Sequence, residues 1–408
     1  ICDYYIDIAK KHTADVVLIE VGGTIGDIEN ELYVEATRRL AKKVGSDNSM
    51  FVHMTYVPIP NGVDEQKTKP TQQSVSLLKQ KGIFPDVIIA RCSEMLSDSV
   101  KGKIARFCDV DESAIITGLD VDNIYKIPIV FEDQHMSDLI SKKLKIPVRP
   151  EIETWTKLVE AKKETPITVA IAGKYTALED SYASVIEALK HAAAHHNADI
   201  SVSWVDTRST ENFENLTADA VIVPGGFGTG GTEGKIKVIE HCRTNNIPFL
   251  GICYGLQLAV IEYARNVCGI LDAQSTEIVP DTKNPVVDIL EEQKSIKDKG
   301  GTMRLGAYPA ILQKGVIFNQ YKKEEVSERH RHRYEVNPSY HSVLLDKGLV
   351  ISGLSPSKTL AEFIELPQEK HAYFVATQSH PELQSSLLKP APLFMGLVEA
   401  AVARKKNV

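Results

Sequence analysis

Residues 247–264 read IPFLGICYGLQLAVIEYA, and this stretch predicts a strand that passes through a tight turn directly into a helix. The apolar run before Gly251 is typical of a buried strand in a parallel sheet, and the pattern after Gly255 is helical. The two glycines permit a sharp turn that raises the thiol of Cys253 above the sheet at a helix N-terminus, where the dipole favours the thiolate. Cys253 is therefore a candidate nucleophile, although the pentapeptide alone is equally compatible with a buried structural cysteine.

The same alternation of apolar strands and helical segments runs from residue 15 to about residue 128 and resumes at residue 166. Strands that alternate with helices predict parallel sheets covered on both faces, so we expect two doubly wound α/β domains. Between them, the charged stretch EIETWTKLVEAKKETP is bracketed by prolines, which is typical of a linker. The predicted organisation is a first domain at 1–147, a linker at 148–165 and a second domain at 166–408.

The composition excludes several classes of protein. The chain has 408 residues, 43% of them hydrophobic and 25% charged, as expected of a globular protein with more than one core. The net charge of −7 argues against broad nucleic-acid binding, and no apolar run reaches the roughly 20 residues of a membrane span. The six cysteines form no CxxC pair, so we expect reduced thiols and a cytoplasmic protein.

Two further segments place reactive groups at the ends of predicted strands. ADAVIVPGGFG (218–228) ends in glycines whose bare N–H groups could hold an oxyanion, although a plain turn would look similar. AYFVATQSHPE (372–382) ends in His380 and Glu382, so the imidazole can meet Cys253 while the carboxylate steadies it. A lone histidine is usually solvated or structural, but three strand ends that each supply one part of a cysteine acyl-transfer site point to catalysis.

Through FLGICYGLQ, VPGGFG and QSHPE, residues 166–408 resemble the class I glutamine amidotransferases. The resemblance implies that Cys253 attacks the carboxamide of glutamine, forms a glutamyl thioester and releases ammonia, with His380 as proton carrier and Glu382 holding the imidazole. By the same resemblance Gly226 lies at the oxyanion position. The residues that the resemblance implies for the amino-acid end of glutamine are Gln257, Glu277 and Arg333.

The segment ERHRHRYEVN (328–337), which contains Arg333, has two other interpretations. It could be a solvated basic loop, as many such runs are. A metal site at His330 and His332 is less favoured, because no nearby cysteines or carboxylates complete a zinc pattern.

The first domain carries clues to a nucleotide site. VVLIEVGGTIGDIEN predicts a strand ending at Glu20, a glycine-rich turn, and Asp27 to Glu29 at the start of a helix, while KTKPTQ (67–72) lies on a loop before another helix. Lysines at a helix N-terminus suit phosphate, and a strand-end carboxylate suits magnesium. An acidic capping turn and a surface lysine loop are the plain alternatives, and GGTIGD lacks the GK[ST] ending of a Walker A motif.

With EVGGTIGDIE, KTKPTQ, KGKIARFC and DVDNIYKIP ahead of the amidotransferase motifs, the whole chain resembles the CTP synthase family. The resemblance implies ATP-dependent amination of UTP to CTP with Mg2+ and ammonia from glutamine, activation by GTP, inhibition by the product CTP, and a homotetramer. It implies Glu20 as the metal ligand. The implied nucleotide-binding residues are Asp27, Ile28, Glu29, Lys67, Thr68, Lys69, Pro70, Thr71, Gln72, Lys103, Asp120 and Val121.

The chain departs from the family pattern at its start. The amino-terminal part of the P-loop-type, dethiobiotin-synthetase-like synthetase domain, with its phosphate loop and a magnesium-binding aspartate, is absent before Ile1. We therefore expect a truncated synthetase domain, and a chain that alone hydrolyses glutamine but does not make CTP. The alternatives are another amidotransferase-coupled ATP-dependent amidoligase and a non-catalytic assembly subunit.

Overall fold

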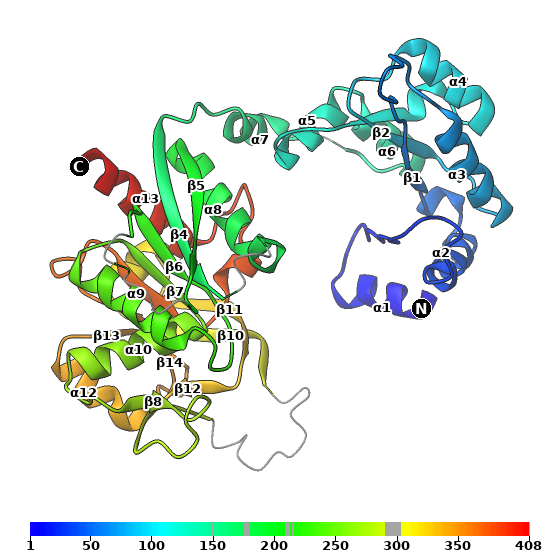
Figure 1. Ribbon diagram of the computed structural model, residues 1–408. Helices are drawn as coiled ribbons and strands as arrows, with labels where there is room; N and C mark the ends of the chain where they lie inside the picture. Colours follow the sequence, from blue (N-terminus) through cyan, green and yellow to red (C-terminus); the bar gives the residue numbers. More distant parts are fainter. Residues whose placement is uncertain (149, 175–178, 209–212, 214–215, 290–302, 408) are drawn as a thin grey trace. The chain divides into compact units, whose positions relative to one another are not determined.

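The computed structural model of the protein describes residues 1–148, 150–174, 179–208, 213, 216–289 and 303–407. The chain divides into two compact units, Ile1–Val159 and Glu160–Val408, each with its own hydrophobic clusters (Figure 1). The limits of the predicted domains and linker remain predictions. No helix within these described ranges is both long enough and apolar enough to cross a membrane.

A nine-stranded sheet forms the centre of the second unit, in the order β11-β10-β13-β14-β15-β7-β6-β4-β5. The parallel strands are β4 (Thr165–Gly173), β5 (Ala198–Asp206), β6 (Ala220–Val223), β7 (Phe249–Ile252) and β15 (Phe374–Thr377). The antiparallel strands are β10 (Arg304–Leu312), β11 (Glu325–His332), β13 (Val350–Leu354) and β14 (Ala361–Glu365). Because β7 and β15 are parallel neighbours, the segments that follow them meet at one edge of the sheet.

Helices cover both faces of this sheet (Figure 1). They are α8 (Ala183–His196), α9 (Thr232–Thr244), α10 (Tyr254–Asn266) and α13 (Pro392–Asn407). Successive side chains of a strand point to opposite faces, so Ala170 and Ala172 of β4 pack with α9 and α10, whereas Val169 and Ile171 pack with α8 and α13. The prediction of a doubly wound α/β fold is confirmed for this unit.

The carboxyl-terminal half of the second unit adds elements that the alternation pattern did not predict. They are a small sheet of β8 (Ala273–Ser275), β9 (Asn284–Ile289) and β12 (Tyr334–Val336), and the helices α11 (Val316–Tyr321) and α12 (His341–Asp346). Residues 328–337 continue β11 into β12, and His330 and His332 are buried while Arg329 and Arg331 are exposed. The solvated-loop interpretation of this segment is therefore wrong, because the alternating residues pair with β10 and half of them face inward.

The first unit contains a parallel sheet in the consecutive order β1-β2-β3. Its elements are α1 (Cys2–Lys11), α2 (Glu31–Val44), β1 (Val52–Tyr56), α3 (Lys69–Gln80), β2 (Val87–Cys92), α4 (Asp98–Cys108), β3 (Ile115–Leu119), α5 (Ile127–Glu132), α6 (Met136–Leu144) and α7 (Ile152–Val159). In β2, Ile88 and Ala90 pack with residues of α3 and α4, whereas Val87 and Ile89 pack with residues of α5 and α6. This sheet is therefore also covered on both faces.

Two expectations for the first unit are wrong. Residues 16–21 are not a strand, and Leu18 is 93% exposed. A strand forms only beside a partner that takes its N–H and C=O groups, and no described segment pairs with these residues. Asp27 to Glu29 lie in turns rather than at the start of a helix, because α2 begins only at Glu31 after Asn30.

Candidate active site

Cys253 lies between β7 and α10 in a backbone conformation that side chains rarely adopt, with φ 52° and ψ −99°. Its N–H donates to the carbonyl oxygen of Thr377 at 2.7 Å, which ties the turn to β15. A Cβ at Gly251 would lie 2.9 Å from that of Ala376, and one at Gly255 would collide with the carbonyl oxygen of Val223. The two glycines therefore allow the close approach that holds Cys253 in this turn.

His380 and Glu382 follow the neighbouring strand and lie beside Cys253. His380 Nδ1 donates to Glu382 Oε1 at 2.7 Å, and a hydrogen bond joins the imidazole to the thiol of Cys253. Burial alone would lower the pKa of His380, but hydrogen bonds with Cys253 and Glu382 outweigh burial and raise that pKa to about 10. The arrangement therefore favours a charged imidazolium between two acceptors, as a thiolate–imidazolium pair requires.

The glycine loop after β6 lies against this pair. A Cβ at Gly225 would come 2.8 Å from Cε1 of His380 and 3.7 Å from Cβ of Cys253. The described residues offer no hydrogen-bond acceptor to the N–H groups of Gly226 and Tyr254, the residue after the nucleophile. Two free N–H groups beside a thiol suit the oxyanion of a tetrahedral intermediate.

Three contacts hold this loop in place. The Gly228 N–H donates to Glu277 Oε1 at 2.9 Å, and the Tyr254 hydroxyl donates to the Gly228 carbonyl oxygen at 2.9 Å. Lys174 Nζ donates to the carbonyl oxygen of Phe227 at 2.7 Å. Glu277, which was expected at the amino-acid end of glutamine, thus lies at the loop with one carboxylate oxygen already engaged.

Gln257 is buried one helical turn beyond Cys253, and its amide Nε2 donates to the carbonyl oxygen of Tyr334 at 2.8 Å and to Gln378 Oε1 at 3.3 Å. Gln378 in turn donates from Nε2 to Cys253 Sγ at 3.7 Å. Sequence reasoning assigned no role to Gln378, although the residue stands two positions before His380 in QSHPE. The structure therefore links Gln257 to the thiol through a residue that its place in the motif could have indicated.

Arg333 lies in the bend between β11 and β12 and is half-buried. Burial is the main cause that raises the pKa of the Tyr334 hydroxyl. The charge of Glu277 also raises this pKa, and the charge of Arg333 lowers it. All three residues expected to bind the amino-acid end of glutamine therefore lie near Tyr334. Glu277 and Arg333 act on its hydroxyl, and Gln257 binds its carbonyl oxygen.

A buried ionic cluster next to the site was missed. Arg304 donates to Glu335 at 3.2 Å and to Glu362 at 2.6 Å, and His330 and His332 share a hydrogen bond of 2.8 Å between their rings. Burial lowers the pKa of His330 to about 3 and that of His332 well below its ordinary value, so both rings are neutral. The sequence showed the basic run but not which of its members face inward.

In the first unit, a cavity of about 290 Å³ gathers Glu20, Asp27 and Glu29 with Tyr5 and Tyr33. Ile28 is 90% exposed and lies outside its lining. The described residues contain no group of three or more His, Cys, Asp or Glu side chains that could hold a metal ion. Glu20 therefore lies among acidic neighbours without forming a complete metal site.

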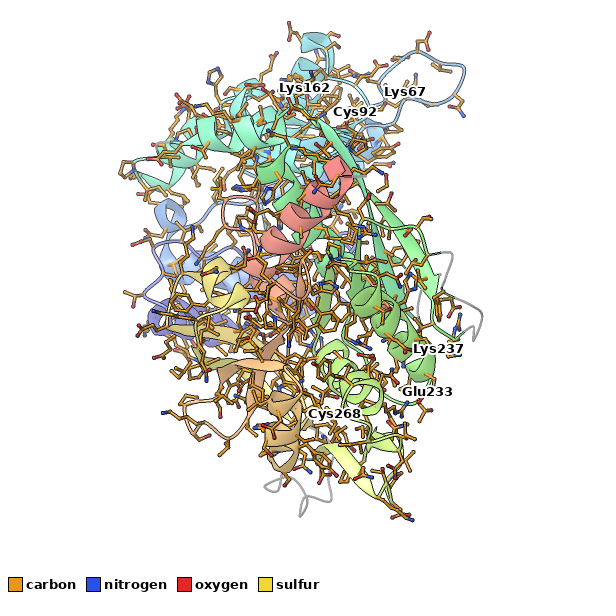
Figure 2. The ribbon with its side chains drawn as sticks, turned by 90° about the vertical axis from the view of Figure 1, so that its left-hand side faces the viewer. Lys67, Cys92, Lys162, Glu233, Lys237 and Cys268 are labelled. Carbon is orange, nitrogen blue, oxygen red and sulfur yellow. The ribbon has the colours of Figure 1, made fainter. Side chains whose placement is uncertain are left out.

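The predicted lysine loop lies elsewhere in that unit, and Lys67 stands on an irregular segment that projects from the fold (Figure 2). The expectation that 67–72 as a whole is a loop is wrong, because α3 already begins at Lys69. Lys67 Nζ contacts Glu65 Oε2 at 2.5 Å, and the charge of Lys103 also acts on Glu65, so Lys67 and Lys103 lie near one another. Lys69 and Pro70 are exposed in the first turn of α3.

The other predicted nucleotide-binding residues are held by structural contacts. Thr71 Oγ1 donates to Thr55 Oγ1 at 3.1 Å, and Gln72 Nε2 donates to Thr68 Oγ1 at 3.0 Å. Asp120, which precedes the half-buried Val121, accepts a hydrogen bond from Arg91 Nε at 2.7 Å. None of these residues lines the acidic cavity.

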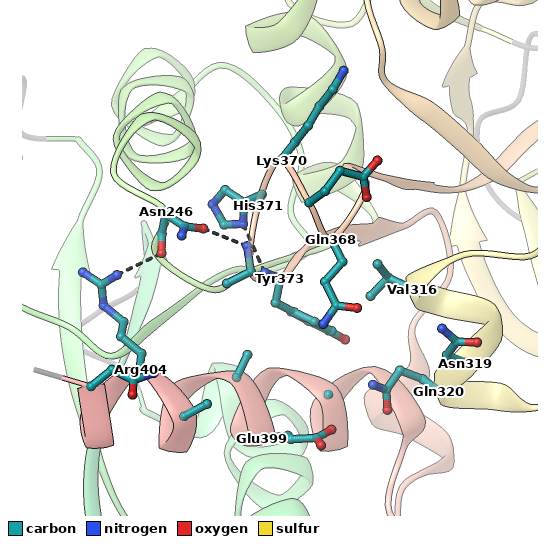
Figure 3. Close-up of a pocket in the computed structure, with 16 residues that line it drawn as sticks. Asn246, Val316, Asn319, Gln320, Gln368, Lys370, His371, Tyr373, Glu399 and Arg404 are labelled. Atoms are coloured by element: carbon teal, nitrogen blue, oxygen red, sulfur yellow. Dashed lines mark hydrogen bonds between the residues drawn. The ribbon is translucent and has the colours of Figure 1, made fainter.

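A cavity in the second unit lies away from the triad. It has a volume of about 650 Å³ and is lined by α13 and by the segments before β7 and β15, including Asn246, Tyr373 and Arg404 (Figure 3). These segments lie at the amino ends of the two strands, whereas Cys253 and His380 follow their carboxyl ends. The cavity therefore plays no part in the candidate site.

Two family models match the chain. The model described as "CTP synthase N-terminus" matches residues 1–146, and the model described as "Glutamine amidotransferase class-I" matches residues 177–400.

Relatives of known identity match almost the whole chain. A CTP synthase of Borreliella burgdorferi is 49% identical over 405 residues, which are 97% of this chain and 76% of the relative. A CTP synthase of Methanocaldococcus jannaschii is 48% identical over 96% of this chain and 75% of the relative. The structure of the glutaminase domain of Trypanosoma brucei CTPS with bound acivicin is similar with a TM-score of 0.54 and 35% identity, covering 58% of this chain and 94% of that chain.

Proposed function

The chain belongs to the CTP synthase family, and from this premise we propose that it hydrolyses glutamine at Cys253, His380 and Glu382 to supply ammonia for the ATP-dependent amination of UTP, the ligase reaction of the family. The single observation that carries the glutaminase half is the hydrogen-bonded order of thiol, imidazole and carboxylate at the ends of two adjacent parallel strands. Neither alternative interpretation, another amidoligase or an assembly subunit, has an observation in its favour.

In the proposed first step the thiolate of Cys253 attacks the carboxamide carbon of glutamine. A bond forms between Sγ and this carbon, and the electron pair of the carbonyl group moves onto its oxygen. In this proposal the N–H groups of Gly226 and Tyr254, for which the described residues offer no acceptor, donate to that oxyanion.

Collapse of the intermediate breaks the C–N bond. His380 gives its proton to the leaving nitrogen, ammonia departs, and a γ-glutamyl thioester remains. A water molecule then loses a proton to His380 while its oxygen attacks the thioester, and cleavage of the C–S bond yields glutamate. Glu382 holds the imidazole through Nδ1 in both steps, so that Nε2 faces the reacting atoms.

The amino-acid end of glutamine carries both charges, and the residues near Tyr334 suit a zwitterion. We assign the α-carboxylate to Arg333 and the ammonium to Glu277, whose second carboxylate oxygen is not taken by the Gly228 N–H. Gln257 holds the Tyr334 carbonyl group and thereby the segment that carries Arg333.

In the first unit we assign the pyrimidine nucleotide and ATP to the acidic turn, to the lysines Lys67, Lys69 and Lys103, and to Asp120 and Val121. A magnesium ion carried by nucleotide phosphates needs only one or two protein carboxylates, and Glu20 fits that limited role. Such an ion would neutralise charge on the phosphates. Activation by GTP, inhibition by CTP and assembly as a homotetramer belong to the same proposal, and the six unpaired cysteines support a reducing cytoplasm.

The experiment that tests the proposal compares Cys253→Ala with Cys268→Ala, a half-buried cysteine beyond the far end of α10. We expect Cys253→Ala to abolish release of glutamate and ammonia from glutamine, and Cys268→Ala to retain it. In a preparation that makes CTP, external ammonia should still support CTP formation by Cys253→Ala, because it bypasses the thiol. Unchanged glutamine hydrolysis by Cys253→Ala would refute the assignment, and equal loss of both activities would refute the two-site division.

A further inference from the structure

Lys235 is a buried lysine that the proposed reaction does not use. It lies in the first turns of α9, and only 2% of its surface is exposed. In the described part of the chain its ammonium makes no hydrogen bond and no ion pair, and it lies over the ring of Tyr254. Lysines are almost never fully buried without a partner, because an unpaired charge inside a protein is costly. A side chain held at such cost needs a reason.

The position of the ammonium points to the oxyanion loop. Nζ lies 3.4 Å from the place of a Cβ at Gly226 and 5.2 Å from the ring centroid of Tyr254. These are the two residues whose free N–H groups face the reacting carbonyl oxygen in the proposed reaction. The ammonium therefore lies beside both donors, with the Tyr254 ring as its nearest electron-rich surface.

No acidic side chain among the described residues around Lys235 compensates its charge, so the charge is compensated only when a negative group forms at Cys253. Burial, and next the charge of Lys174, lower the pKa of Lys235 to about 8, while the charge of Cys253 acts in the opposite direction. The two acids that act on Tyr254 are engaged elsewhere, since Glu233 pairs with Arg265 at 2.9 Å and Glu277 binds the Gly228 N–H. Cys253 is thus the one negative group that acts on this ammonium among the described residues.

We propose that Lys235 is a positioning residue of the glutaminase, whose buried ammonium packs against the Gly226 loop and stabilises the negative charge that passes from the Cys253 thiolate to the oxyanion. This inference rests on the proposed function. Lys235 does not contact the substrate carbonyl group, and it acts through the loop and through its field in a site of low polarity.

The test replaces Lys235 with Met, which has a similar shape and no charge, and compares it with Lys237→Met on the exposed face of the same helix (Figure 2). Two measurements are made on each protein: kcat/KM for glutamine hydrolysis, and the rate at which iodoacetamide alkylates Cys253 as a function of pH, followed on the Cys253 peptide. We expect Lys235→Met to lower kcat/KM by about 10- to 100-fold and to move the alkylation profile to higher pH. Lys237→Met should change neither.

Thermal unfolding separates this role from a structural one. Removal of an unpaired buried charge should leave the melting temperature of Lys235→Met equal to or above that of wild type. Wild-type hydrolysis and an unshifted alkylation profile in Lys235→Met would overturn the inference, and so would a loss of activity that merely follows a fall in melting temperature. If Lys235→Met does not fold, Lys235→Gln is measured against the same outcomes. Failure of the wild-type protein to hydrolyse glutamine would instead overturn the proposed function.

Discussion

Cys253 adopts a strained backbone conformation, with φ 52° and ψ −99°. Such a conformation costs on the order of 1–3 kcal/mol and persists only where the surroundings enforce it. Here the hydrogen bond from its N–H to Thr377 and the packing of Gly255 against Val223 enforce it. This conformation places the thiol at the start of α10 and beside His380. The reactive position of Cys253 therefore comes with a local loss of stability.

At the residue scale, Glu382 should matter through charge rather than shape. Glu382→Gln keeps the size of the side chain but removes the negative charge that, with Cys253, keeps His380 protonated. We expect kcat for glutamine hydrolysis to fall by roughly 100-fold or more, and the pKa of His380, measured by NMR of labelled histidine, to fall from its raised value. Glu369→Gln, at an exposed position in the same unit, is the control. A His380 pKa that does not change would contradict this role for the carboxylate.

At the scale of elements, the junction of β7 and α10 leaves no room for a methyl group. In Gly255→Ala the new Cβ meets the carbonyl oxygen of Val223 in β6, so either the strand or the helix must shift. We expect a loss of about 1–3 kcal/mol in the free energy of unfolding together with loss of glutamine hydrolysis, measured by urea titration and by glutamate release. In the helix α4, Gly102→Ala has room and should be neutral or stabilising. Full activity of Gly255→Ala would show that the turn between β7 and α10 can widen without loss of function.

The cluster of Arg304, Glu335 and Glu362 joins three strands, β10, β12 and β14, and predicts a pH dependence of stability. Burial, and next the charge of Glu362, raise the pKa of Glu335 from 4.5 to about 8 against the opposing effect of Arg304. Between these two pH values the folded protein keeps a proton that the unfolded chain has released, so the contribution of Glu335 to the free energy of unfolding falls as pH rises. The glutamine in Glu335→Gln cannot ionise, so this variant lacks the decrease in the free energy of unfolding with rising pH.

We therefore expect the free energy of unfolding of Glu335→Gln, relative to wild type, to rise by on the order of 1 kcal/mol or more from about pH 5 to about pH 8. Urea titrations across this range measure this difference in the free energy of unfolding. For Glu369→Gln the difference from wild type should not change with pH. A constant difference for Glu335→Gln would mean that Arg304 keeps both carboxylates ionised throughout.

The sequence predicts those elements whose signal is local. Ile247–Ala264 holds its strand, turn and helix within a single stretch, and the triad follows because parallel strands end at the same edge. Residues 16–21 carry the same apolar signal and form no strand, because strand formation depends on a neighbour that composition cannot reveal. The antiparallel strands β10, β11, β13 and β14 were missed for the same reason, and Lys235 was missed because its burial follows from the packing of α9.

At the scale of the whole molecule, the chain combines two hydrophobic cores with two proposed chemistries. Ile1–Val159 has clusters around β1, β2 and β3, and Glu160–Val408 has separate clusters on the two faces of its large sheet. Because each unit buries its own apolar surface, each should unfold as its own cooperative transition. The proposed ligands are divided in the same way, with nucleotides assigned to the first unit and glutamine to the second.

This division predicts that each ligand stabilises only the unit that binds it. Calorimetry of the protein should show two transitions, and UTP at about 100 times its dissociation constant should add roughly 2.7 kcal/mol to one of them. Alkylation of Cys253 by iodoacetamide should shift only the transition of the second unit. Lys67→Gln with Lys69→Gln, one substitution on the projecting segment and one in the first turn of α3, should remove the response to UTP and leave glutamine hydrolysis without nucleotide unchanged. A single transition that both treatments shift equally would mean that the two units unfold together and that their sites are coupled through stability.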